Sequence, residues 1–336
     1  MRLFLYEYVT GGGMCNQGSI PDSLLSEGRG MVEAFAADLV SAGFDVDRMI
    51  DRTVCPVAQI PPKELTYHHF RSPEEEKPIF ERLANSADHT ILIAPETDGA
   101  LTERVEWTLA AGGQLLGPGH QVTALTTDKH QLANHLVAAS VPVPKGVAVA
   151  AGSRLPDDFH YPAVLKPRDG AGSQHMHLLG HADPEMHVSF AARLEEHVEG
   201  QPISVGVLSG PGGITALPAC RQLISQDGKF TYLGGSLPLS EQQADRGEQL
   251  AMRAANACGD FRGYMGIDLI LGTHADEDRV IEINPRLTTS YLLLRQVADQ
   301  NLAASIVRWS LEQCPSPSFS PRKVSFALSH LQEVFA

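Results

Sequence analysis

The sequence predicts an α/β domain followed by two α+β subdomains, and three observations predict this fold class. Up to about residue 116, apolar strand-like runs alternate with helix-like stretches, as in sheets covered by helices. Between about residues 147 and 209, short strand-like runs surround a glycine-rich loop. The remainder, to about residue 314, is typical of an antiparallel sheet with helices. We therefore expect an N-terminal α/β domain over 1–116, a central subdomain over 117–198 and a C-terminal subdomain over 199–330.

The elements of the N-terminal domain follow from apolar spacing and from Gly and Pro positions. The stretch from Thr53 to Pro78 is polar and Pro-rich, so we expect a long loop there. The strands expected are Leu3–Tyr8, Phe44–Met49 and His89–Ala94. The helices expected are Leu24–Ala42, Pro78–Ala87 and Leu101–Gly112.

The rest of the chain is interpreted in the same way. A helix should begin after Thr127 or Asp128, either of which can cap it, and run to about Ala139. The strands expected next are Tyr161–Lys166, His177–Leu179 and Ile203–Leu208. The further helices expected are Pro184–Leu194, Glu241–Cys258 and Tyr291–Leu311.

Composition excludes several classes of partner. With 26 Lys and Arg against 40 Asp and Glu, the net charge of −14 argues against nucleic acid or an anionic membrane. No apolar run approaches membrane length and the N-terminus does not resemble a secretory signal, so we expect a cytoplasmic protein. The oligomeric state is left open, with a homodimer as one expectation. The cysteines contain no CxxC pair, so we expect structural thiols rather than a zinc site; they are Cys15, Cys55, Cys220, Cys258 and Cys314.

The stretch 266–286 carries the strongest functional pattern. It holds two short apolar runs separated by a polar turn and therefore predicts a β-hairpin. Alternate side chains of a strand share a face. Glu282 and Asn284 should therefore point one way, while Ile281 and Ile283 point into a core.

The polar face of this hairpin predicts a metal site. Asp268 on the first strand should lie beside Glu282 and Asn284 on the second. Two carboxylates and an amide oxygen form a hard-oxygen site that suits Mg²⁺, or Mn²⁺, together with phosphate oxygens. Arg286 follows directly after Pro285 and offers a planar fork to phosphate or carboxylate. Solvated surface carboxylates are the alternative interpretation of the two acids.

A second pattern predicts phosphate contacts. Lys166 ends an apolar strand, and the loop Gly170–Gln174 follows it. Backbone N–H groups of such a loop can lie against phosphates, and its glycines would let it close as a mobile lid. The loop does not have the Walker A pattern, and a purely structural glycine-rich hairpin is the alternative.

Together these segments resemble the ATP-grasp family, whose usual activity is the ATP-dependent joining of a carboxylate to an amine or thiol. The resemblance covers roughly residues 115–310 and implies an ATP-grasp fold with an N-terminal pre-ATP-grasp domain. The motifs occur in the family's order; they are Asp128-Lys129, Val164–Pro167, Gly170–Ser173, Glu196–Gly200, Gly266–Asp268 and Glu282–Arg286.

The resemblance implies roles for individual residues. Glu196 and the backbone of Val198 would hold adenine. Many members have a ribose-binding Glu at the position of Pro202, so Glu199 is the candidate substitute. An Arg that often precedes the first metal-binding Asp is Gly266 here. Phosphate contacts would come from Lys129, Lys166, Gly170, Gly172 and Ser173, the metal site would be Asp268, Glu282 and Asn284, and Arg286 would steady the acyl phosphate.

The expected activity is an ATP-dependent carboxylate–amine ligase with an acyl-phosphate intermediate, which forms an amide bond and ADP. The partners expected are therefore small-molecule carboxylate and amine substrates. A small-molecule kinase of the same family is the alternative, since it would phosphorylate a hydroxyl and stop. A nucleotide-binding protein without turnover is a third class, which the two lysines and the three metal ligands disfavour.

A further resemblance is to the tyramine–L-glutamate ligase group of methanofuran biosynthesis. It implies L-glutamate and tyramine as substrates, and the segments that carry it are 6–12, 93–99, 221–222 and 232–235. Glu7, Thr10 and Glu96 fall at expected carboxyl ends of strands, where open α/β sheets bind ligands. We expect them, with Arg221, to contact a substrate; helix capping is the alternative for Glu7 and Glu96.

Overall fold

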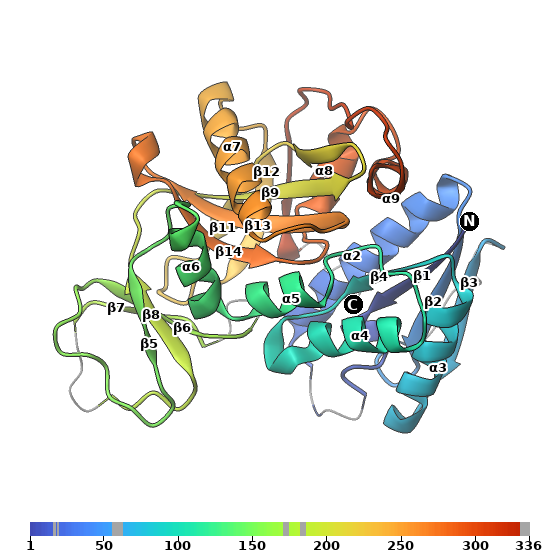
Figure 1. Ribbon diagram of the computed structural model, residues 1–336, viewed down its shortest axis with the longest axis horizontal. Helices are drawn as coiled ribbons and strands as arrows, with labels where there is room; N and C mark the ends of the chain where they lie inside the picture. The colour runs from blue at the N-terminus through green and yellow to red at the C-terminus, as the bar shows by residue number, and fades with distance from the viewer. Residues whose placement is uncertain (16–17, 19, 56–62, 171–174, 182–185, 330–336) are drawn as a thin grey trace.

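The computed structural model describes the whole chain except residues 16–17, 19, 56–62, 171–174, 182–185 and 330–336. Its described part forms three sheets (Figure 1). One is parallel and lies in the N-terminal third of the chain, and the other two are antiparallel. The expected sequence of an α/β domain followed by α+β structure is confirmed.

The parallel sheet has the strand order β3-β2-β1-β4. Along β1 the side chains alternate, so Leu3 and Leu5 enter the core under α2, whereas Phe4 and Tyr6 enter the core under α3 and α4. Both faces are therefore covered, as parallel sheets require. The strands are β1 (Arg2–Glu7), β2 (Asp45–Asp51), β3 (Leu65–Phe70) and β4 (His89–Ile93). The helices are α1 (Tyr8–Gly11), α2 (Asp22–Ser41), α3 (Pro73–Ser86), η1 (Thr97–Gly99) and α4 (Ala100–Ala110).

The expected long loop from Thr53 to Pro78 is wrong in its second half. β3 lies inside it and adds to the edge of the sheet, and α3 begins at Pro73 rather than at Pro78. A proline is tolerated in the first turn of a helix because the N–H it lacks has no partner there. β3 was not predicted because it contains polar residues such as His68 and His69. An edge strand can be polar.

The small antiparallel sheet has the order β5-β8-β6-β7. The expected helix Pro184–Leu194 is wrong, because its described residues contain no helix and its end belongs to β8. Ala192 and Leu194 alternate into a small core instead of following a helical period. The strands are β5 (Gly146–Val149), β6 (Ala163–Pro167), β7 (His177–Leu179) and β8 (Ala192–Glu196).

The large antiparallel sheet follows the path β14-β13-β9-β11-β12-β15, with β10 paired to β9. α6 and α7 cover one face of it through a shared apolar core. Its strands are β9 (Gln201–Gly210), β10 (Gly213–Ala216), β11 (Cys220–Ile224), β12 (Tyr232–Leu237), β13 (Gly263–Leu271), β14 (Arg279–Asn284) and β15 (Val324–Ala327). The helices are α5 (His120–Thr127), α6 (Lys129–Ala138), α7 (Glu241–Ala257), η2 (Ala275–Glu277), α8 (Tyr291–Val297) and α9 (Leu302–Leu311).

The expected helix Tyr291–Leu311 is two helices, α8 and α9. Asn301 ends the break between them, since its side chain accepts a hydrogen bond from the Ala304 amide and caps α9. The helix expected after Asp128 is confirmed as α6, with the Asp128 side chain as its cap.

One large core joins the parallel sheet to the C-terminal part of the chain. It contains Leu3 and Phe35 from the N-terminal domain together with Tyr291, Val307 and Trp309 from α8 and α9. The ring centroids of Phe35 and Tyr291 are 5.1 Å apart. Figure 1 shows α2 running between the parallel sheet and these two helices. None of the helices in the described ranges has the length and apolar character needed to cross a membrane, and none of the five cysteines is in a disulfide.

Candidate active site

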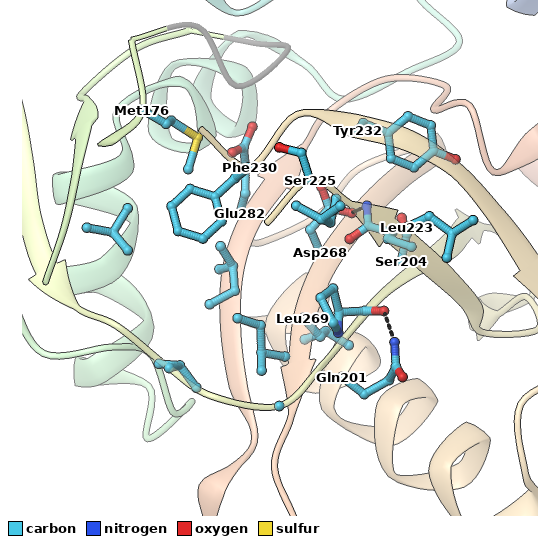
Figure 2. A pocket seen from close by; sticks show the side chains of 18 of the residues that line it. Met176, Gln201, Ser204, Leu223, Ser225, Phe230, Tyr232, Asp268, Leu269 and Glu282 are labelled. Carbon is cyan, nitrogen blue, oxygen red and sulfur yellow. Dashed lines mark hydrogen bonds between the residues drawn. The ribbon is translucent and has the colours of Figure 1, made fainter. Parts of the chain in front are cut away.

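A cavity of about 730 Å³ lies where the small sheet meets the large sheet. Its walls come from β8 and the segment after it, from β11 to β14, and from α2. Figure 2 shows Asp268 and Glu282 on the cavity wall, with Met176 and Phe230 on one side of them in this view and Tyr232 on the other. The volume is of the size that small-molecule and cofactor sites have.

The expected hairpin is formed by β13 and β14. Asp268 pairs with Glu282 and Gly266 with Asn284, so the polar residues share one face. The register shifts between Asp268 and Leu269, which makes a β-bulge. The bulge corrects one expectation, because Ile281 borders the cavity instead of entering the core.

The two carboxylates of the hairpin, Asp268 and Glu282, repel each other. Burial, and then the Glu282 charge, raise the pKa of Asp268 to about 6. Gln222 Nε2 and Asn284 Nδ2 each donate to Asp268 at 3.1 Å. The Lys129 ammonium lies 3.7 Å from Glu282 Oε1. A cation between Asp268 and Glu282 would relieve the repulsion that raises this pKa.

These donors fit a hard cation such as Mg²⁺, because they are carboxylate oxygens beside an amide. As placed, Asn284 turns its Nδ2 to Asp268 and its Oδ1 to Arg286, at 3.4 Å from Arg286 Nη2. The amide would have to rotate by half a turn for its oxygen to join the carboxylates. Within the described residues, no group of three or more His, Cys, Asp or Glu side chains is arranged for a metal ion. The candidate site therefore has two protein carboxylates and needs further oxygens from a ligand.

Both expected phosphate lysines are buried and already have partners. Lys129 Nζ donates to the Gly170 carbonyl at 2.7 Å. Lys166 Nζ forms a 2.6 Å ion pair with Glu195 Oε1 and donates to the Ile281 carbonyl at 3.2 Å. Each ammonium group thus lies beside β14, Lys129 near the Glu282 carboxylate and Lys166 at the Ile281 carbonyl. The expected contacts of Gly172 and Ser173, and the lid itself, lie outside the described residues.

The segment expected to hold adenine and ribose borders the cavity. Glu196, Val198, Glu199 and Pro202 all line it. Apolar side chains face the same space, among them Met176 and Phe230. An apolar slot beside exposed backbone groups suits a flat heteroaromatic ring.

Arg286 links the cavity to the N-terminal domain. Its Nε and Nη2 donate to the two oxygens of Glu96, each at 3.0 Å. Glu96 follows the carboxyl end of β4 and is buried, as is most of Arg286. Glu96 therefore contacts Arg286 rather than the open cavity, and the bidentate pair fixes the direction of the guanidinium.

Of the other expected substrate residues, Glu7 and Thr10 are not among the described residues that line the cavity, whereas Arg221 is. Glu7 is buried and caps α1, because its carboxylate accepts from the amides of Val9 and Thr10 and from the Thr10 hydroxyl. The capping alternative therefore describes Glu7, and Thr10 is occupied by the same contact. Arg221 pairs with Ile203, on the face of the large sheet opposite to Asp268, and its side chain is exposed.

Sequence reasoning missed several residues of this site. Glu195 lies one position before the expected Glu196 and bridges Lys166 to Arg193, whose Nε is 2.7 Å from Glu195 Oε2. Recognising β8 as a strand would have found it, since alternation puts Glu195 and Glu196 on different faces. Glu27, which also lines the cavity, carries no local sequence pattern. Tyr232 lines it too, and although the segment 232–235 carries a family resemblance, no role was predicted for Tyr232.

Comparison with protein families identifies the class of protein. Residues 126–290 match the ATP-grasp domain family ATP-grasp_3, and residues 51–121 match the pre ATP-grasp 3 domain. The chain belongs to the ATP-grasp family and carries a pre-ATP-grasp domain. The family uses ATP with Mg²⁺.

Part of the chain is also similar in sequence to two curated proteins. The chain is 31% identical over 115 residues to a tyramine–L-glutamate ligase of Methanocaldococcus fervens, which is 34% of this chain and 36% of that protein. It is 31% identical over 97 residues to the tyramine–L-glutamate ligase of Methanocaldococcus jannaschii, or 29% of this chain and 30% of that protein. The matched segments thus span about a third of each curated relative.

Solved structures share the fold. An ATP-grasp superfamily protein from Archaeoglobus fulgidus has a TM-score of 0.70 at 20% identity, over 97% of this chain and 98% of that one. The ADP complex of PurK, an N5-carboxyaminoimidazole ribonucleotide synthetase, has a TM-score of 0.73 at 15% identity, over 96% and 80%. An L-amino acid ligase from Bacillus licheniformis has a TM-score of 0.69 at 14% identity, over 92% and 73%. The expected ATP-grasp fold is confirmed.

Proposed function

We propose that this chain is an ATP-dependent carboxylate–amine ligase that acts through an acyl phosphate. The observation that carries the proposal is the arrangement around Asp268 and Glu282. A facing pair of acids, with Lys129 beside it, borders the same cavity as the fixed Arg286 guanidinium. Such a site can neutralise a nucleotide's phosphates and hold a second anion next to them.

Bound Mg²⁺ would neutralise negative charge on the ATP phosphates. Asp268 and Glu282, with Asn284 after rotation of its amide, would hold it. Glu196, Val198 and Glu199 would orient the nucleoside, and Lys129 with Lys166 would face its phosphates. Arg286, aimed by Glu96, would hold the substrate carboxylate for in-line attack on the γ-phosphoryl group. The protein supplies position and charge, and no nucleophilic side chain is required.

L-Glutamate as the acid and tyramine as the amine are the proposed substrates. The support is the partial identity with two tyramine–L-glutamate ligases. On the basis of the same partial identity, we propose that the protein has a role in methanofuran biosynthesis in the cytoplasm. A family kinase that stops after phosphoryl transfer is the second candidate, since the charge arrangement around Arg286 would serve a hydroxyl acceptor as well.

The experiment crosses a panel of amino acids with a panel of amines that includes tyramine, and follows ADP release. A ligase should release ADP only when both co-substrates are present, or form a hydroxamate when hydroxylamine replaces the amine. The amide product should be identified by mass spectrometry. Phosphorylation of a hydroxyl compound without any amine would instead establish the kinase.

A further inference from the structure

The end of the cavity formed by α2 has chemistry that the ATP site does not use. Glu27 and Met31 are four residues apart on α2, so they share one face of the helix, and both line the cavity. Opposite them are side chains of the large sheet and of the segment after β14; these are Cys220, Tyr232, Arg286, Thr289 and Ser290.

The Glu27 carboxylate has no hydrogen bond or ion pair with any residue that the structure describes. Burial raises its pKa to about 7, and the Arg286 charge offsets only part of that rise. Among the described residues, the titratable groups that face it are the Arg286 guanidinium, the Tyr232 phenol and the Cys220 thiol. Behind it, Glu7 is already held by α1 and lies against Gly28. Glu27 is half-buried, and a carboxylate that is partly withdrawn from water without a partner is less stable than a paired one. Glu27 can therefore accept a cationic partner from the cavity.

Among the described residues, the same end of the cavity has no further arginine or lysine for a second carboxylate. Among the described residues that line the cavity, the arginines and lysines are Arg221 and Arg286. Arg286, which Glu96 orients, is assigned to the carboxylate of the acid co-substrate, and Arg221 is on the opposite face of the sheet. Met31 and the Tyr232 ring give this end an apolar surface. The ligand that fits is therefore a primary amine with an apolar or aromatic body and no acid group.

We propose that Glu27 binds the ammonium group of the amine co-substrate and removes a proton from it. This inference rests on the proposed function and assigns the amine subsite within it. The Glu27 carboxylate takes one proton from R–NH₃⁺, which leaves R–NH₂ with a free electron pair. That pair attacks the acyl carbon, so a C–N bond forms and the C–O bond to phosphate breaks. The phosphate leaves with the bonding electrons and takes the second proton from nitrogen, and Glu27 returns its proton to solvent.

The test is Glu27→Gln, which keeps the shape of the side chain but can neither carry the charge nor accept the proton. The kcat/KM for the amine should fall about 100-fold or more. Hydroxamate formation from hydroxylamine, which is already unprotonated near neutral pH, should stay within about threefold of the parent rate. The acid limb near pH 7 in the amine kcat/KM profile should disappear.

The matched control is Glu33→Gln on the same helix, since Glu33 is half-exposed and pairs with Arg29. It should leave the amine kcat/KM unchanged, and thermal unfolding should show that both variants fold. Equal loss of hydroxamate and amide in Glu27→Gln would overturn the proposal, because Glu27 would then serve acyl-phosphate formation. An unchanged amine kcat/KM would overturn it as well. Failure of the proposed function is distinct, since the parent itself would then form no hydroxamate.

Discussion

Several charged residues at the cavity are held by one another before any ligand binds, although Glu27 is not. Lys166 and Glu195 are almost completely buried and lie 2.6 Å apart, and Arg193 satisfies the second oxygen of Glu195. Arg286 and Glu96 form a separate, bidentate pair. Removing one member of such a pair leaves an uncompensated buried charge and costs about 3–5 kcal/mol. The site is therefore preorganised, and its charges do not have to be gathered during the reaction.

At the residue scale, Glu282→Gln tests the metal site. The substitution removes one of the two negative charges facing the proposed Mg²⁺ while keeping the strand. We expect kcat to fall about 100-fold or more, since the site holds only two carboxylates. Steady-state kinetics with saturating ATP and Mg²⁺ measure this. The control Asp276→Asn, in the exposed turn of the same hairpin, should behave as the parent. A loss below about threefold, or about 0.7 kcal/mol of barrier, would place the metal elsewhere.

Glu96→Gln tests whether Glu96 acts through Arg286. With the bidentate carboxylate lost, the guanidinium should move, so kcat should fall about 10-fold or more while the KM for ATP changes little. A double-mutant cycle with Arg286→Met is the decisive measurement. The double variant should be no slower than Arg286→Met alone, because the two residues act as one unit. Additive losses would mean that Glu96 has a separate role.

At the element scale, the bulge in the β13–β14 hairpin decides which side chains stabilise the fold. Ile283 is fully buried under α7, whereas Ile281 is half-buried and borders the cavity. Ile283→Ala should therefore lower the free energy of unfolding by about 2–5 kcal/mol. Ile281→Ala should cost less than half as much and instead weaken nucleotide binding. Urea denaturation and nucleotide titration measure the two effects, and equal destabilisation would contradict the bulge.

Elements were predictable where apolar spacing alone decides them. The helix ending at Gly43, the buried strand at His89 and the hairpin at 266–286 were found because each has a clear period and clear ends. β8 was not predicted as a strand, because its partners β5 and β6 lie far away from it in the sequence. The break at Asn301 was missed because the apolar period continues across it.

The candidate site was predictable only in the part that the family motifs mark. The order of the family motifs predicted that Glu196, Asp268 and Glu282 belong to one site. In the structure all three line the same cavity. Glu27 was not predicted, because only folding brings α2 against β12 and the end of β14. The substrate roles of Glu7 and Arg221 stay predictions. Glu7 caps α1, and strand alternation places Arg221 on the face opposite to Asp268, although Arg221 still lines the cavity.

At the scale of the whole molecule, Asp38 ties the two ends of the chain together. It accepts hydrogen bonds from Tyr291 at 2.5 Å and from Arg295 Nε at 2.7 Å, across the contact of α2 with α8. Asp38→Asn should lower the free energy of unfolding by about 1–3 kcal/mol. Glu33→Gln, which breaks a half-exposed pair on the same helix, should cost about 0.5 kcal/mol or less. Denaturation by urea measures both, and equal effects would show that the link is not energetically important.

The long separation between Glu96 and Arg286, 190 residues, has a consequence for synthesis on the ribosome. A nascent chain that has just completed β8 already carries its pre-ATP-grasp domain, together with Lys129, Lys166 and Glu195. It lacks the hairpin acids, and Arg286 is still to be translated. Because α8 and α9 also complete the core around Phe35, the growing chain gains stability and the full cavity together. A prematurely terminated chain should therefore be a substrate for proteases before it can consume ATP.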